Sequence, residues 1–336
     1  MVGELVYSFV RREGREVVAA IDAKTGEELW QSGYAVPYMP SDPAAAHGAG
    51  PKATPAYSDG RLFTLGIVGT VTAFDVGAGK LLWQTERPDE PPYFGAASSP
   101  LAGEGIVVAH PGNYGPLTAF DVLTGRVVWT VGNAGFFASP ILAEFADMSQ
   151  VVTITTNSVI GVSFPEGELL WSYPWNGTTG GPTPVVHGDT VIVSGHNFGT
   201  TAFNVIRANG EWTTETAWQT AEVSMYTSTP VVLNGILFGL SHRSRGQYFA
   251  VNATTGRVLW LGPPRTAENT AVVKADELLF LLNDDAELVV AEFSGSQFDE
   301  LRRYSVADTA TWAQPAITGK RMFVKDVDSL ALWTFD

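Results

Sequence analysis

Short apolar runs, separated by turn-forming residues, follow one another along the whole chain. Arg61–Leu65 and Thr190–Val193 are typical, since each follows a Gly- or Asp-containing turn and is rich in β-branched or aromatic side chains. Short runs bounded by turns favour strands, because an amphipathic helix needs about ten residues or more. The pattern therefore predicts an all-β protein.

The runs belong to a repeat. The segment Ala20–Trp30 (AIDAKTGEELW) recurs as Ala73–Trp83, Ala119–Trp129 and Ala250–Trp260. An aromatic residue closes each copy, at Trp30, Trp83, Trp129, Trp171, Trp218, Trp260 and Tyr304. A spacing of roughly 45 residues is the period of a four-stranded propeller blade. A propeller ring counts as one domain, so we expect a single domain over residues 1–336.

Two features of the repeat are predicted to be structural. In the Asp-x-x-Thr-Gly turn, the carboxylates of Asp22, Asp75 and Asp121 can accept backbone N–H groups two or three residues on, and Gly79 and Gly125 take the positive-φ position. The Trp side chains fill the wedge between neighbouring blades, where a large ring buries much area while its N–H still finds an acceptor. We expect no catalytic role for either set.

Counting strands predicts the number of blades. Six copies are complete, the first (Glu4–Trp30) lacks its innermost strand, and the last (Gln314–Asp336) stops after its third strand. Thirty strands are two short of eight full blades. We therefore predict an eight-bladed propeller, with a seven-bladed ring as the alternative. Because a propeller closes by pairing its ends, we expect the missing pair upstream of Met1, or else a ring that closes imperfectly.

The repeated Ala-x-Asp-x-x-Thr-Gly-x-x-x-Trp signature resembles the PQQ-type propeller repeat, and the resemblance covers almost the whole chain. That repeat is found in quinoprotein alcohol dehydrogenases and in non-enzymatic proteins similar to the outer-membrane assembly lipoprotein of Gram-negative bacteria. The resemblance implies the propeller fold and leaves both functions open.

The dehydrogenase branch implies PQQ held between a Trp floor and a vicinal disulfide, beside calcium or a lanthanide bound by Glu, Asn and a catalytic Asp. This chain has no Cys, and no Glu, Asn and Asp set aligns with that metal site. At 336 residues it also lacks the long insertions that build the enzyme's pocket. We expect no catalytic residue, no metal site and no cofactor. The alternative is a PQQ-dependent alcohol or sugar dehydrogenase with calcium and an atypical pocket.

Composition and charge narrow the possible partners and the cellular location of the protein. The formal net charge of −15 disfavours nucleic acid and acidic membranes as partners. The sequence has no apolar run of about eighteen residues that could span a membrane, and no signal-peptide pattern follows Met1. The absence of Cys fits an oxidising compartment, and the family that the repeat resembles works in the periplasm or outside the cell. We expect the same location here.

The candidate binding face follows from strand parity. With the strands of a blade called A to D in chain order, the B–C loops and the D–A links emerge on one face, and these segments are long and varied, as functional loops on a rigid scaffold usually are. Aromatic residues in the D–A links should ring the channel mouth: Tyr93, Phe94, Phe136, Phe137, Tyr226 and Trp312. The same face should carry four of the five His residues, His47, His110, His196 and His242, with Arg243 and Arg245 as partners for anions.

The sequence gives weaker signals for metal binding or catalysis on this face. The acidic turns Asn283–Glu287 and Asp326–Asp328 could offer oxygen ligands to calcium, but neither follows an EF-hand pattern. No H-x-H spacing, G-x-S-x-G motif or phosphate loop is present. We therefore expect a non-catalytic propeller that recognises a protein, peptide or extended ligand on the B–C/D–A face. Lyase or hydrolase chemistry by the His and Tyr residues of this face is a further alternative.

Overall fold

Every strand pairs antiparallel with a neighbour in sequence in the computed structural model, which describes residues 1–177 and 180–335. The strands of these residues form eight sheets, six with four strands and two with three. The three-stranded sheets are the first and the last, as the sequence predicts. The protein is an eight-bladed β-propeller, and the seven-bladed alternative is wrong.

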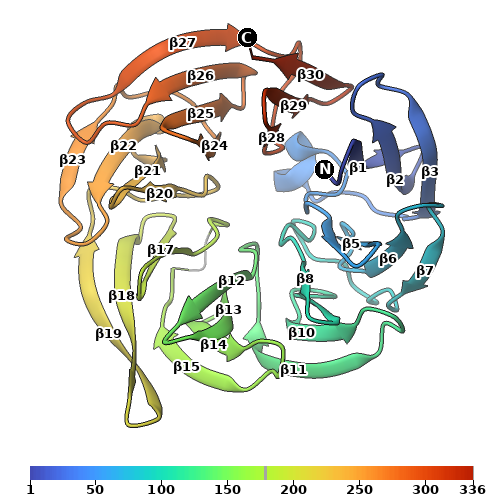
Figure 1. Ribbon diagram of the computed structural model, residues 1–336, viewed down its shortest axis with the longest axis horizontal. Helices are drawn as coiled ribbons and strands as arrows, with labels where there is room; N and C mark the ends of the chain where they lie inside the picture. Colours follow the sequence, from blue (N-terminus) through green and yellow to red (C-terminus); the bar gives the residue numbers. More distant parts are fainter. Residues whose placement is uncertain (178–179, 336) are drawn as a thin grey trace. The chain divides into compact units, whose positions relative to one another are not determined.

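The chain divides into two compact units, residues 1–178 and 179–336, with four blades in each. The prediction of a single domain stays a prediction. Figure 1 follows the blades of the first unit from blue to green and those of the second from yellow to red. The first unit also carries a short 3-10 helix, η1 (Asp42–His47), and the second carries η2 (Arg243–Arg245).

The strands of the first unit make four blades. Blade 1 is β1 (Leu5–Arg12), β2 (Arg15–Asp22) and β3 (Glu28–Ala35); blade 2 is β4 (Ala56–Ser58), β5 (Arg61–Leu65), β6 (Val71–Asp75) and β7 (Leu81–Gln84); blade 3 is β8 (Leu101–Gly103), β9 (Ile106–Ala109), β10 (Pro116–Asp121) and β11 (Val127–Ala134); blade 4 is β12 (Ile141–Phe145), β13 (Met148–Ile154), β14 (Ser158–Ser163) and β15 (Leu169–Pro174).

The strands of the second unit make the other four. Blade 5 is β16 (Val185–His187), β17 (Thr190–Gly195), β18 (Gly199–Ala208) and β19 (Glu211–Thr220); blade 6 is β20 (Val231–Leu233), β21 (Ile236–Ser241), β22 (Gln247–Asn252) and β23 (Val258–Leu261); blade 7 is β24 (Thr270–Ala275), β25 (Leu278–Asn283), β26 (Glu287–Glu292) and β27 (Asp299–Ser305); blade 8 is β28 (Ala316–Thr318), β29 (Arg321–Lys325) and β30 (Leu330–Thr334).

The middle strands of each blade are buried on both faces. All four residues of β9 are buried, whereas the outer strand β11 of the same blade has no buried residue. Blades pack face to face within each unit, so that Phe63 and Leu65 of blade 2 share a core with Val107 and Ala109 of blade 3. This two-sided burial explains why the middle strands read as continuous apolar runs, while the outer strands mix apolar and polar residues.

The Asp turns are formed as predicted. One Oδ1 atom of Asp22 accepts the backbone N–H groups of Lys24 and Thr25, at 2.9 and 2.7 Å. Asp121 makes the same bonds, and Asp75 accepts one from Ala78. The bonds from Thr25 hold the pKa of Asp22 below its usual range, because they favour the charged carboxylate. These hydrogen bonds lie within the hairpin turns that join the third and fourth strands.

The Trp side chains join neighbouring blades in most copies. An indole N–H of one blade donates to a backbone carbonyl just beyond the third strand of the next, in the pairs Trp30 to Val76, Trp83 to Val122, Trp129 to Pro165, Trp218 to Ala253, and Trp260 to Ser294. Two copies differ from these five. Trp171 donates to Gln150 of its own blade, and Tyr304 is 44% exposed.

Candidate functional site

Five aromatic rings meet in the first unit. Phe94 lies in the link between blades 2 and 3, Tyr114 in the β9–β10 loop, and Phe136 and Phe137 in the link between blades 3 and 4. Phe94 and Phe137 have ring centroids 5.9 Å apart, and Tyr114 stacks on Phe136 at 5.2 Å. Tyr93 adds a fifth ring, edge-on to Phe94 at 4.9 Å. We call these five residues the aromatic cluster.

The aromatic cluster is held by polar contacts to its backbone. The Tyr114 hydroxyl accepts a hydrogen bond from the Phe94 N–H at 3.0 Å. The Lys52 ammonium donates to the Phe94 carbonyl at 2.7 Å, and the Ser41 hydroxyl donates to the Tyr93 carbonyl at the same distance. Burial lowers the pKa of Lys52. The cluster is therefore a fixed surface whose outer rings, Tyr93 and Phe94, are 58% and 39% exposed.

A second group gathers around two His residues in the second unit. His196 and Asn197 lie in the β17–β18 loop, Tyr226 in the link between blades 5 and 6, and His242 just after β21. The rings of His196 and His242 have centroids 4.3 Å apart, and Tyr226 lies 4.8 Å from His196. We call these four residues the histidine cluster. Strand parity predicts that these residues lie on one face, and within the second unit their loops do bring them together.

A hydrogen bond to the backbone fixes the orientation of His242. Its Nδ1 lies 2.6 Å from the Ser224 carbonyl oxygen and its Nε2 lies 3.2 Å from Oδ1 of Asn197. Burial lowers the pKa of His242, and the nearby His196 and Arg243 lower it further. The ring is therefore neutral near pH 7, with the proton on Nδ1.

The two Arg residues follow His242 in η2. Ser244 and Arg245 have φ values of 55° and 62°, so the chain turns sharply there. His242 and Arg245 line a pocket of about 390 Å³ together with Gly246 and Glu268. Because the lining carries a carboxylate as well as a guanidinium, this pocket is not a simple anion site.

Three other predicted residues are not members of the two clusters as defined above. His110 is only 2% exposed, and its Nδ1 and Nε2 bond the Gly115 carbonyl and the Thr153 hydroxyl, each at 2.9 Å. Burial lowers its pKa to about 4. It joins blades 3 and 4 and offers no exposed ring at the channel mouth. His47 ends η1, and Trp312, 41% exposed, lies between β27 and β28.

The acidic turns bond to their own backbone and neighbours. Asn283 is fully buried, and its Oδ1 accepts from the hydroxyls of Tyr248 and Thr270. One oxygen of Asp284 caps the N–H groups of Glu268 and Asn269, and Asp326 caps its own turn. Among residues 1–177 and 180–335 there is no group of three or more His, Asp or Glu side chains placed to hold a metal ion.

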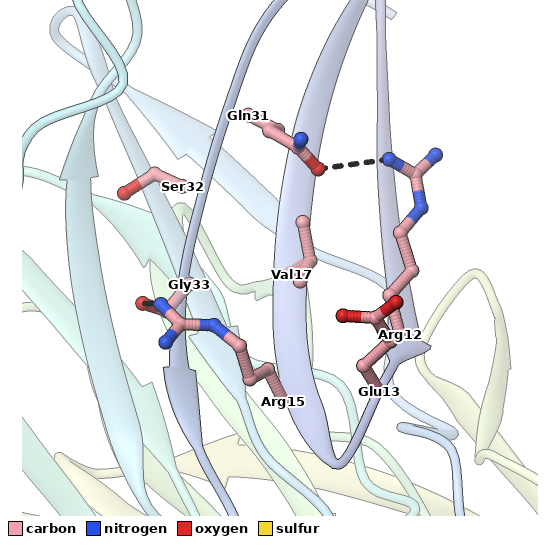
Figure 2. A pocket seen from close by; sticks show the side chains of 7 residues that line it. All are labelled: Arg12, Glu13, Arg15, Val17, Gln31, Ser32 and Gly33. Atoms are coloured by element: carbon pink, nitrogen blue, oxygen red, sulfur yellow. Dashed lines mark hydrogen bonds between the residues drawn. The ribbon is translucent and has the colours of Figure 1, made fainter.

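A larger pocket, about 620 Å³, lies on blade 1. Figure 2 shows Arg12 pointing to the amide of Gln31, and Arg15 reaching the backbone at Gly33. Arg12 also pairs with Glu28 at 2.7 Å, so its charge is already compensated. Sequence reasoning did not single out this pocket.

Sequence reasoning placed Tyr114, Asn197 and Lys52 in loops of the predicted face but did not select them as site residues. Tyr114 lies in the same loop as His110, between Gly112 and Gly115, and Asn197 directly follows His196. Their loops were part of the predicted face, and this position on the face was the only sign in the sequence that these residues could belong to a site. What the sequence could not provide was the pairing of Tyr114 with the backbone of Phe94.

No helix within the described ranges has the length and apolar composition of a membrane span. The arrangement offers aromatic surface, imidazole and guanidinium groups at loop ends. These groups suit recognition of a partner or ligand.

Comparison with known proteins identifies solved structures that share this fold. Among solved structures, BamB from Moraxella catarrhalis superposes with a TM-score of 0.71 at 15% identity, covering 98% of this chain and all of that one. The computationally designed Ika8 protein gives 0.67 at 13% identity, covering 99% and 97%. A europium-containing methanol dehydrogenase gives 0.66 at 14% identity, covering 96% of this chain and 81% of that one. At these identities the likeness shows the fold.

No curated protein matches the sequence. A family model described as "Outer membrane protein assembly factor BamB" matches residues 14–262, which is most of the chain. The chain thus belongs to the family that this model represents.

Proposed function

We propose that this chain is a non-catalytic binding protein that recognises a protein or peptide partner on the B–C/D–A loop face. The observation that carries the proposal is the aromatic cluster. Its five rings come from three successive loop segments, and Tyr93 and Phe94 expose large apolar surfaces. Aromatic residues are enriched at binding hot spots, because a large rigid ring buries much area at low entropic cost.

The support of the cluster favours binding over mere packing. The bonds from Lys52 and Ser41 and to Tyr114 order the link before any partner arrives. An ordered surface loses less conformational freedom on binding, so more of the contact energy appears as affinity. A partner segment with apolar or aromatic side chains and little negative charge fits this surface, since the chain itself carries a net charge of −15.

The family supports the same kind of partner. Its description as an outer membrane protein assembly factor favours a protein partner over a small substrate, and it favours a location in the periplasm or outside the cell. The net charge disfavours nucleic acid as the partner.

Selection of random peptides displayed on phage tests the proposal. Peptides enriched on the purified protein are measured by fluorescence anisotropy against it and against a Tyr93→Ala, Phe94→Ala double variant. We expect the double variant to weaken binding by about tenfold or more, as for a hot-spot pair. Tyr57→Ala is the matched control, because Tyr57 is a 44% exposed aromatic residue on β4, outside the cluster.

Two results count against the proposal. Either no peptide is enriched, or the enriched peptides bind the double variant and the Tyr57 control equally well. Tyr114→Phe refines the test: it keeps the ring and removes only the acceptor of the Phe94 N–H. We expect it to weaken peptide binding about fivefold, the equivalent of one hydrogen bond of about 1 kcal/mol.

The alternative is a PQQ-dependent alcohol or sugar dehydrogenase with calcium and an atypical pocket. The PQQ-type repeat and the likeness to a methanol dehydrogenase fold support it. Among the described residues, no three His, Asp or Glu side chains converge.

A further inference from the structure

A fully buried carboxylate joins blade 1 to blade 2. Glu16 has no exposed surface, and it lies opposite Tyr34 in the β2–β3 pairing. Its Oε1 accepts the Ile67 N–H at 2.6 Å, and its Oε2 accepts the Tyr34 hydroxyl at 2.8 Å. Burying a carboxylate costs free energy that hydrogen-bond donors must offset. Tyr34 belongs to the same blade as Glu16, so it is the bond to Ile67 that ties β2 to the loop after β5.

Residues 66–70, between β5 and β6, form a tight turn, which we call the β5–β6 turn. The Gly66 N–H donates to the Thr70 carbonyl at 2.9 Å, and the Gly69 N–H donates to the Gly66 carbonyl at 2.8 Å. A Cβ on Gly66 would collide with Oε2 of Glu16, so the carboxylate lies directly against the turn. Because its backbone is bonded both internally and to Glu16, we expect the turn to move as one rigid segment.

The link that carries Tyr93 and Phe94 rests on the β5–β6 turn. The Ala96 N–H donates to the Ile67 carbonyl at 2.8 Å. Gly95 has a φ of 77°, and a Cβ there would collide with the Ile67 side chain, so the link lies directly on that residue. Ile67 therefore bonds the buried carboxylate through its N–H and the link of the two exposed rings through its carbonyl.

The β9–β10 loop, which carries Tyr114, rests on the same turn. The Gly112 N–H donates to the Gly69 carbonyl at 2.7 Å, two residues before Tyr114. Gly69 has a φ of 86°, and a Cβ there would collide with the backbone of Gly112. Tyr114 in turn accepts the Phe94 N–H at 3.0 Å. One turn thus supports both partners of the hydrogen bond that orders the aromatic cluster.

We propose that Glu16 is a positioning residue of the aromatic cluster, which acts through the β5–β6 turn on the rings of the link and of the β9–β10 loop. Contiguous hydrogen bonds of this kind carry energetic coupling between groups that do not touch. The bonds from Lys52 and Ser41 remain without the carboxylate, so its loss should loosen the rings and not dismantle them. This role rests on the proposed function, because the alignment of the rings affects affinity only if they bind a partner.

Amide hydrogen exchange of the free full chain tests the positioning without any partner. The reporters are fragments that cover residues 93–97 and 111–115, which contain the two amides that donate to the β5–β6 turn. Glu16→Ala should speed exchange in both fragments by about fivefold, the equivalent of one hydrogen bond lost. Glu16→Gln keeps an acceptor for the Ile67 N–H, so its rates should lie close to those of the parent chain.

Trp30→Phe is the matched control, because it removes another hydrogen bond between blades 1 and 2. Trp30 Nε1 donates to the Val76 carbonyl at 3.2 Å, and Trp30 lies near the opposite end of the β2–β3 pairing from Glu16. Both fragments should keep the parent rates in this control. Equal acceleration in Trp30→Phe and Glu16→Ala overturns the proposal, because the fragments then respond only to general destabilisation.

Tyr34→Phe supplies a milder variant. It removes the hydroxyl bond to Glu16 but keeps the ring, and it should speed exchange in both fragments by a smaller factor than Glu16→Ala does. If Glu16→Ala fails to fold, the comparison of Tyr34→Phe with Trp30→Phe decides the same question. Parent rates in both fragments of Tyr34→Phe and of any folded Glu16→Ala overturn the proposal.

Binding of the phage-selected peptides separates this role from the proposed function. By fluorescence anisotropy, Glu16→Ala should weaken peptide binding by about fivefold, while Glu16→Gln and Trp30→Phe should bind as the parent chain does. Loss of binding in the Tyr93→Ala, Phe94→Ala double variant with no change in Glu16→Ala overturns the positioning role and leaves the binding face intact. Faster exchange in both fragments, with no peptide that depends on the two rings, supports positioning by Glu16 and counts against the proposed function.

Discussion

The indole nitrogen of Trp83 donates a hydrogen bond to the backbone carbonyl of Val122, 3.0 Å away in the next blade. The same ring packs on Gly125, the last residue of that blade's Asp turn. The repeat places a Trp at the end of one copy and Thr-Gly in the next. These residues therefore form one packing contact between neighbouring blades, which we call the joint. The joint recurs at each blade boundary that carries both residues.

Gly125→Ala should break this joint. A Cβ at Gly125 would lie 2.6 Å from Cδ2 of Trp83, and the residue has a φ of 70°. We expect a loss of about 2–3 kcal/mol in the free energy of unfolding, from overpacking added to left-handed backbone strain. Gly105→Ala is the control, because its φ is 79° but no atom lies within 4 Å of the added Cβ. Melting temperatures that fall equally in both variants would contradict the joint.

His110 should make stability depend on pH. Its pKa is about 4 in the folded protein, against about 6.5 when unfolded. Because the unfolded chain takes up the proton first, the stabilisation is complete above pH 6.5 and is lost as the pH falls from there to about 4, by about 3 kcal/mol in all. Thermal unfolding of the parent chain and His110→Gln across this range measures the effect. The gap between the two melting temperatures should shrink as the pH falls; a constant gap would contradict the prediction.

Glu16 should anchor the loop after β5. Its side chain is fully buried, Oε1 accepts the Ile67 N–H at 2.6 Å, and Oε2 accepts the Tyr34 hydroxyl at 2.8 Å. Burial raises the pKa of Glu16. Glu16→Ala removes the carboxylate that accepts from both donors and should cost about 3 kcal/mol of stability. Glu16→Gln keeps an acceptor for Ile67 and should cost less. Chemical denaturation of both variants measures this order, and equal losses would show that the hydrogen bonds are not what matters.

PQQ should not bind. In a titration with PQQ and calcium chloride, followed by absorbance and by thermal unfolding, we expect no saturable change and no rise in melting temperature. A ligand that binds only the folded state raises the melting temperature, by an amount that corresponds to about 2.7 kcal/mol at one hundred times its Kd. Saturable binding near about one equivalent would instead favour the dehydrogenase alternative.

The repeat was predictable because its interactions are local or recur. The Asp22 and Asp121 turns bond within three residues, so their residue types alone specify the hairpin. Once consecutive repeats are known to form neighbouring blades, each Trp ring is expected to pack against the next repeat. The N–H of Trp171 donates instead to Gln150 of its own blade, and nothing in the repeat pattern marks that Gln as an acceptor.

The candidate sites were predictable only as a face. Parity gathered the B–C loops and D–A links, but residues on one face need not touch. His110 lay on that face by count, yet its ring is buried between blades 3 and 4. Tyr114 and Asn197 gained their roles from contacts with Phe94 and His242 that no spacing in the sequence encodes.

The sequence by itself determined the eight-bladed plan, the strand bounds near each turn and the Trp joints, because short-range hydrogen bonding and strand burial repeat with the chain. The tertiary structure alone decided which loop residues meet. His196 and His242 stand in loops of different blades, and the distance between their rings depends on the packing and twist of whole sheets, which are set by many weak contacts summed over each blade.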